Sequence, residues 1–141
     1  MGHTQHPYLR GDLVIVIDVA SLDRAAEFWS AVLGYVREGD GGDRYLSLLP
    51  ADGADGRGGR DGAGAEILLQ RVPDVKQGKN RVHLDLRTRD LDAEVARLTG
   101  LGAQLVTSEP VTESGWRWHV LADPDGNEFC TLEPPASYWP D

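Results

Sequence analysis

A histidine and a carboxylate lie two residues apart in an alternating segment of this chain. Residues 81–87 switch between apolar and polar types, which is typical of a strand. His83 and Asp85 are therefore expected on the same side of that strand. Such a pair can act as a general base, or it can hold a ligand by hydrogen bonds. The alternative is that His83 only hydrogen-bonds to polar neighbours such as Arg87 or Gln70.

Two tryptophans alternate near the C-terminal end. Trp116 and Trp118 are expected on one face of a strand, with Arg117 and His119 on the other. Tryptophan side chains can line an aromatic pocket for a planar ligand, or they can belong to the core. We expect Trp118 to face a ligand, whereas Trp29 falls in a helical apolar stripe and is expected in the core.

Other chemical motifs are absent from the sequence. Cys130 is the single cysteine, so an internal disulfide and a CxxC zinc pattern are both excluded. A lone cysteine is most simply a small buried hydrophobe. The chain has no GxGxxG, Walker or GxSxG motif.

The composition limits the class of protein. The 141 residues are 40% hydrophobic and 26% charged, which fits one globular domain. A net charge of −9 opposes binding to nucleic acids and anionic membranes. No apolar run approaches the roughly 20 residues that cross a bilayer, and residues 1–12 lack the pattern of a signal peptide. We expect a cytoplasmic protein whose partner is a small molecule, with no nucleic acid and no membrane.

The first half predicts a strand, a helix and three further strands. An apolar run at 13–17 indicates a buried strand. A helical stripe follows, with Ser21 as its N-cap and Gly34 at its end. Strands are expected at 35–38, 44–49 and 66–72. Residues 51–64 are rich in Gly, Asp and Ala without apolar periodicity, so they predict a long mobile loop, with a functional lid as the alternative.

The second half repeats this order after a linker at 73–80. Asp90 is expected to cap a helix that begins at Leu91, and Asp123–Gly126 predict a type I turn. The expected strands are 81–87, 104–107, 117–122 and 128–133. The tail at 134–141 is expected to cover the surface without regular structure. Val14 precedes Leu22 by the same spacing that separates His83 from Leu91, which supports an internal repeat.

Three segments carry a resemblance to a known superfamily: residues 21–35, residues 82–92 and Ala122–Cys130, whose "ADPDGNEFC" turn is the most specific. On these the sequence resembles the vicinal oxygen chelate superfamily, which contains glyoxalase I, extradiol dioxygenases and bleomycin resistance proteins. The similarity is greatest to its glyoxalase-like domain branch and spans about residues 13–133.

The resemblance implies an α+β fold made of two βαβββ modules. Eight strands would surround a cleft, with one helix outside each module, in a single glyoxalase-like domain covering 1–141. Module one would span about 12–72 and module two about 81–133. The residues expected to line the ligand-binding cleft are Val14, Val16, Gln70, His83, Asp85, Trp118 and Cys130.

The resemblance also implies where enzymes of this superfamily hold a divalent metal. The corresponding positions here are Val14, Gln70, His83 and Cys130. Val14 cannot bind a metal, and Cys130 supplies sulfur where a glutamate is usual. Because a catalytic site needs about three protein ligands, we expect a degenerate site with no metal and no other cofactor. The alternative is that His83, Gln70 and Cys130 together bind zinc or copper.

The expected function is a glyoxalase/bleomycin-resistance-like protein that binds a small organic molecule. The acidic Asp18, Glu66 and Asp85 favour an uncharged or cationic ligand. The alternative is a lyase, isomerase or oxygenase, using a rearranged metal site or metal-free acid–base catalysis by His83 and Asp85. A regulatory or immunity role is a third alternative. The resemblance implies a homodimer; if the modules are exchanged between its chains, Val14 and His83 would face each other across the two chains.

Overall fold

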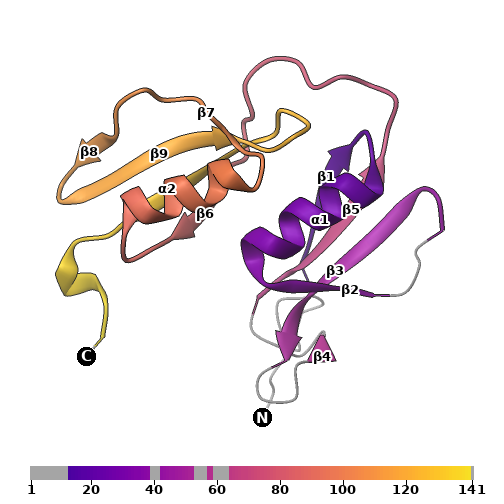
Figure 1. Cartoon of the computed structure of the whole chain (residues 1–141), viewed down its shortest axis with the longest axis horizontal. Helices are drawn as coiled ribbons and strands as arrows, with labels where there is room; N and C mark the ends of the chain where they lie inside the picture. The colour runs from indigo at the N-terminus through magenta and orange to yellow at the C-terminus, as the bar shows by residue number, and fades with distance from the viewer. Residues whose placement is uncertain (1–12, 39–41, 53–56, 59–63, 141) are drawn as a thin grey trace, which may run out of the picture. The chain divides into compact units, whose positions relative to one another are not determined.

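The computed structural model describes residues 13–38, 42–52, 57–58 and 64–140. The chain divides into two compact units, Met1–Pro73 and Asp74–Asp141. Each unit runs from a strand through a helix into a set of further strands (Figure 1). The α+β class and the two successive βαβββ modules predicted from the sequence are therefore confirmed.

The first unit has one helix on a mixed sheet (Figure 1). Its elements are β1 (Val14–Val19), α1 (Leu22–Leu33), β2 (Tyr35–Glu38), β3 (Tyr45–Asp52), β4 (Arg57–Gly58) and β5 (Glu66–Arg71). The strand order is β1-β5-β3-β2, with β4 paired to β3. β1 runs parallel to β5, whereas the other pairs are antiparallel.

Helix α1 begins and ends as its sequence predicts. The Ser21 hydroxyl accepts a hydrogen bond from the Arg24 backbone N–H at 3.2 Å. Gly34 ends the helix with φ of 71°, in the left-handed region that glycine adopts without strain. The helix buries Trp29 to 1% exposure, confirming it as a core residue. The surrounding core comprises Ile17, Val19, Ala25, Ala26, Phe28, Val32, Leu46, Leu48, Ile67 and Leu69.

The second unit repeats this arrangement (Figure 1). Its elements are β6 (Leu84–Arg87), α2 (Leu91–Gly100), β7 (Gln104–Leu105), β8 (Val111–Glu113), β9 (Trp116–Ala122), β10 (Glu128–Glu133) and the 3-10 helix η3 (Ala136–Tyr138). The strand order is β6-β10-β9-β7, with β8 paired to β9. β10 runs parallel to β6, as β5 runs parallel to β1.

Helix α2 covers one face of the second sheet. Asp90 caps the helix by accepting from the Ala93 N–H at 3.1 Å, as predicted. Glu133 of β10 accepts from the Leu91 N–H at 2.8 Å, which fixes the start of the helix against the sheet. Leu91 and Leu98 are fully buried against strand residues of the same face, which include Leu121, Phe129 and Thr131.

The predicted turn between β9 and β10 is organised by its first residue. The Asp123 side chain is buried and accepts from the backbone N–H groups of Asp125 (2.9 Å) and Asn127 (2.8 Å). It also accepts from the Asn127 side-chain amide at 3.1 Å. Because one carboxylate satisfies three donors, the turn holds β10 in antiparallel register with β9.

Three sequence-based expectations need correction. The described residues contain ten strands, because short strands β4 and β8 join the eight that were predicted. Residues 51–52 and 57–58 belong to a β3–β4 ladder, which backbone hydrogen bonds can form without apolar periodicity; the remainder of the predicted loop up to 63 lies outside the described residues. The tail contains η3, and Tyr138 at the end of this short helix packs edge-on against Trp116.

The strand predicted at 81–87 is shorter than expected. β6 begins at Leu84, so His83 precedes the strand. The Asn80 side chain donates to the Glu128 backbone carbonyl at 3.3 Å, where the incoming chain approaches β10. In the described part of the chain, no helix is long and apolar enough to cross a membrane.

Candidate functional site

The second sheet has a face that points away from α2, and we call it the second open face. Residues facing α2 alternate along each strand with residues of this open face. The strand register places one row of Asp85, Cys130 and Val120 across it. The next row consists of Arg87, Leu132 and Trp118. Asp85, Trp118 and Cys130, three of the predicted site residues, therefore share this face.

Cys130 lies among charged groups at one end of the second open face. Burial raises the pKa of its thiol above the ordinary 9.0. The negative charge of Asp85 raises this pKa further, and the Asp85 carboxylate also accepts a hydrogen bond from the thiol. The charge of Lys79 lowers the thiol pKa and that of Glu128 raises it, each by less than the charge of Asp85 does. The thiol is therefore held in its neutral form, which disfavours its use as a nucleophile or metal ligand.

His83 does not pair with Asp85 in this structure. Its Nε2 atom lies 2.9 Å from the Asn80 carbonyl oxygen, and the ring is exposed. Because a carbonyl can only accept, Nε2 carries a proton in this contact. Asp85 instead contacts Cys130. The two residues do not form the hydrogen-bonded pair that general-base catalysis would use most directly, and their catalytic role stays a prediction.

The residues at the implied metal positions form a poor donor set. Val14 has a hydrocarbon side chain, and the Cys130 thiol is held neutral. The His83 Nε2 contacts the Asn80 carbonyl, so Nδ1 is the nitrogen of this ring that could bind a metal. Across residues 13–38, 42–52, 57–58 and 64–140, no three or more His, Cys, Asp or Glu side chains are grouped so as to hold a metal ion.

The other end of the second open face is aromatic and basic. Trp118 is half-buried beside Leu132, as the register requires. The Arg87 guanidinium lies 5.7 Å from the ring centre of Trp116 and 5.3 Å from that of Tyr138. Its Nη1 also donates to the Tyr138 hydroxyl at 2.7 Å. The face thus runs from carboxylates near Cys130 to a guanidinium at Arg87.

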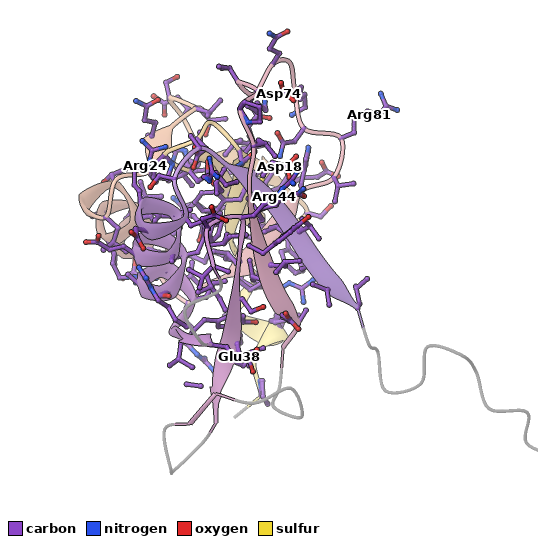
Figure 2. The ribbon with its side chains drawn as sticks, turned by 90° about the vertical axis from the view of Figure 1, so that its right-hand side faces the viewer. Asp18, Arg24, Glu38, Arg44, Asp74 and Arg81 are labelled. Carbon is purple, nitrogen blue, oxygen red and sulfur yellow. The ribbon has the colours of Figure 1, made fainter. Side chains whose placement is uncertain are left out.

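The first sheet also has a face turned away from its helix, which we call the first open face. The register places Val14 opposite Glu66, Val16 opposite Leu68, and Asp18 opposite Gln70. Val14 and Val16 are 38% and 51% exposed. The Ser47 hydroxyl donates to Glu66 at 2.8 Å, and Asp18 and Arg44 lie at the same end of the sheet (Figure 2). Val14, Val16 and Gln70 therefore share one face, apolar at its centre.

Sequence reasoning missed part of the second open face. Arg87 follows Asp85 by two residues, so its position was readable from the same alternation. Its aromatic partner Tyr138 comes from the tail, where no periodicity indicates structure. Leu132 was likewise readable from its spacing of two residues after Cys130.

Comparison with known proteins identifies the family. The glyoxalase-like domain family matches residues 14–132, and the chain belongs to it. No curated protein matches the chain significantly.

Solved structures share the fold at low sequence identity. The fosfomycin resistance protein FosX from Listeria monocytogenes has a TM-score of 0.68 at 18% identity, covering 92% of this chain and 94% of its own. A glyoxalase/bleomycin resistance protein/dioxygenase family enzyme from Burkholderia phytofirmans has a TM-score of 0.63 at 16% identity, with 85% and 95% covered. A glyoxalase/bleomycin resistance protein from Streptomyces sp. CB03234 has a TM-score of 0.53 at 25% identity, with 84% and 96% covered.

Proposed function

We propose that this protein binds a small organic molecule on the second open face and does so without metal chemistry. The observation that carries the proposal is the composition of that face. Trp118 and Leu132 provide apolar contact area in the row that ends at Arg87, and Asp85 lies in the neighbouring row. A few polar groups around an apolar centre are typical of small-molecule sites.

The charges of the face suggest how a ligand is oriented. Asp85 and Glu128 flank Cys130. Lys79 offsets part of their negative charge, and its Nζ lies 3.7 Å from the Glu128 carboxylate. A cationic or hydrogen-bond-donating group is therefore favoured at this end. The indole of Trp118 can stack on a planar part of the same ligand.

The competing proposal is an enzyme of the lyase, isomerase or oxygenase type. His83 and Asp85 have different hydrogen-bond partners, and the raised pKa of Cys130 disfavours the thiolate. The described geometry therefore supports binding better than it supports acid–base or metal-assisted catalysis. Structures that share the fold include a fosfomycin resistance protein and a glyoxalase/bleomycin resistance protein/dioxygenase family enzyme, so the fold alone does not decide between the two proposals.

Binding is tested by thermal unfolding of the protein with a library of planar aromatic and cationic molecules. A ligand that binds the native state raises the midpoint in a concentration-dependent way. We expect Trp118→Ala to lose the stabilisation by a hit. Leu105→Ala is the matched control, because Leu105 is exposed on β7 and pairs with Leu121 of the opposite face. A hit that stabilises the Trp118 variant as much as the wild type would place binding elsewhere.

Metal analysis separates the two functional proposals. Untagged, freshly purified protein is analysed for divalent metals beside a His83→Ala variant. We expect substoichiometric metal in both proteins. A stoichiometric divalent metal that is lost in the variant would exclude the metal-free proposal and favour the enzyme.

A further inference from the structure

Two arginines stack on aromatic rings where the C-terminal tail packs on the second unit. The Arg87 guanidinium lies over Trp116 and Tyr138, as described above. The Arg89 guanidinium lies 4.5 Å from the ring centre of Trp139. Tyr138 packs edge-on against Trp116 at 5.5 Å and against Trp139 at 4.9 Å between ring centres. We call these five residues the arginine–aromatic cluster.

The two guanidinium groups lack a carboxylate partner within the described part of the chain. The hydrogen bond from Arg87 goes to the neutral Tyr138 hydroxyl, and Arg89 makes only the contact with Trp139. Elsewhere in this unit the structure pairs Arg97 with Glu94 at 2.8 Å, and Arg117 with Glu133 at 3.5 Å. Two exposed cations without a counter-charge are notable in a chain of net charge −9.

Aromatic stacking orients a guanidinium without using its hydrogen-bond donors. Arginine has five N–H donors in a planar fork that matches two oxygens of a carboxylate or phosphate. In Arg87 one of these is used by Tyr138, and the guanidinium carbon lies 5.7 Å from the Trp116 ring centre and 5.3 Å from that of Tyr138. The other donors of the exposed Arg87 can therefore bind an oxyanion, and Arg89 adds positive charge through the same cluster.

We propose that the arginine–aromatic cluster binds the oxyanion of a small organic ligand, a carboxylate or a phosphate-type group. Arg87 lies in the row of Leu132 and Trp118, so the cluster continues the second open face. The ligand would place its anionic group at Arg87, its planar part near Trp118, and any donor group towards Asp85. This inference rests on the proposed function and names the chemical class of the ligand.

The test uses benzoate and phenylphosphonate, with benzamide as the uncharged probe of similar shape. Binding to the full-length protein is followed by tryptophan fluorescence and by the NMR signals of the arginine side chains. For fragments of this size we expect dissociation constants on the order of 1–10 mM. Both anions are expected to bind at least about tenfold more tightly than benzamide, because a charge-assisted bidentate pair is lost with the amide. The preference between them shows whether a planar or a tetrahedral oxyanion fits.

Substitutions of single arginines test whether Arg87 binds the anion. Arg87→Gln is expected to weaken both anions about tenfold, and Arg87→Lys to weaken them less, because it keeps the charge but loses the fork. Arg81→Gln removes the same charge from the exposed segment before β6 (Figure 2) and is expected to change affinity less than about twofold. Far-ultraviolet circular dichroism confirms that each variant is folded.

The results distinguish failure of this inference from failure of the proposed function. Equal weakening by Arg87→Gln and Arg81→Gln, or benzamide binding as tightly as benzoate, would overturn the oxyanion site. So would no binding of either anion up to about 20 mM. Library hits that still require Trp118 would leave the proposed function standing in each case, whereas the absence of any such hit would contradict that function separately.

Discussion

Cys130 and Asp85 lie directly opposite each other on the parallel strands β10 and β6. The carboxylate accepts a hydrogen bond from the thiol and keeps it protonated, together with burial. The resemblance to the vicinal oxygen chelate superfamily implies a metal ligand at the position of Cys130. In this protein the neighbouring strand supplies a negative charge that opposes formation of the thiolate.

The thiol pKa should respond in opposite directions to two substitutions. Asp85→Asn removes a charge that raises the pKa, so the pKa should fall but stay above 9.0, because burial is the larger cause. Lys79→Gln removes a charge that lowers it, so the pKa should rise. Cys130 is the only cysteine, and the four tyrosines also ionise at high pH, so the thiolate absorbance is taken as the difference between each protein and the same protein carrying Cys130→Ser. Shifts of the same sign in both variants would contradict this account.

Stability should fall at alkaline pH because of the same thiol. A pKa that is higher in the folded state means that the folded protein binds the proton more tightly than the unfolded chain does. The stabilisation that results is fully present below the thiol pKa of the unfolded chain. It is lost as pH rises through the thiol pKa of the folded protein. The free energy of unfolding, measured in urea, should therefore decrease as pH rises above about 9. Cys130→Ser should show a smaller decrease, and an identical pH dependence would refute the assignment.

The Asp123 carboxylate should be a large contributor to the stability of the second unit. Asp123→Ala leaves the donors of Asp125 and Asn127 without their acceptor, and each unsatisfied buried group costs about 1–3 kcal/mol. Asp74→Ala is the matched control, because Asp74 is exposed (Figure 2). We expect a loss of at least about 2 kcal/mol for Asp123→Ala in chemical unfolding and little change for the control. Equal effects would show that the turn does not depend on this side chain.

Replacing Trp29 should lower the free energy of unfolding more than replacing Trp118. Trp29 is 1% exposed, so Trp29→Ala should lower the free energy of unfolding by about 3–5 kcal/mol. Trp118 is half-buried on the second open face, so Trp118→Ala should cost less in stability while abolishing ligand binding. Denaturant titrations of both variants measure this difference. A Trp118 variant as unstable as the Trp29 variant would identify Trp118 as a core residue.

The sequence predicted the elements well where local chemistry determines them. Ser21 and Asp90 cap the two helices as expected, because a side-chain oxygen at the N-cap has few alternative roles. Gly34 ends α1 because its positive φ favours glycine. Strand 35–38 was predicted with the bounds that the structure shows.

The remaining features depend on contacts between distant segments. β8 pairs with β9 through backbone hydrogen bonds, and its residues Val111–Glu113 are all exposed, so no burial pattern predicts it. Tyr138 meets Arg87 across a large sequence separation, and nothing in the tail indicates that partner. The hydrogen bond from His83 to Asn80 similarly follows from the path of the chain before β6. The alternation of residue types along each strand predicted which residues share a face of the sheet. It did not predict which residues from distant segments contact them.

The most direct test of the central claim is to map a library hit onto the protein by NMR chemical shifts. We expect the largest changes on the Trp118 indole and on backbone amides of Asp85, Arg87 and Cys130, with small changes along α2. Changes concentrated on α2, or a hit that binds only with a stoichiometric metal, would contradict a metal-free ligand site on the second open face.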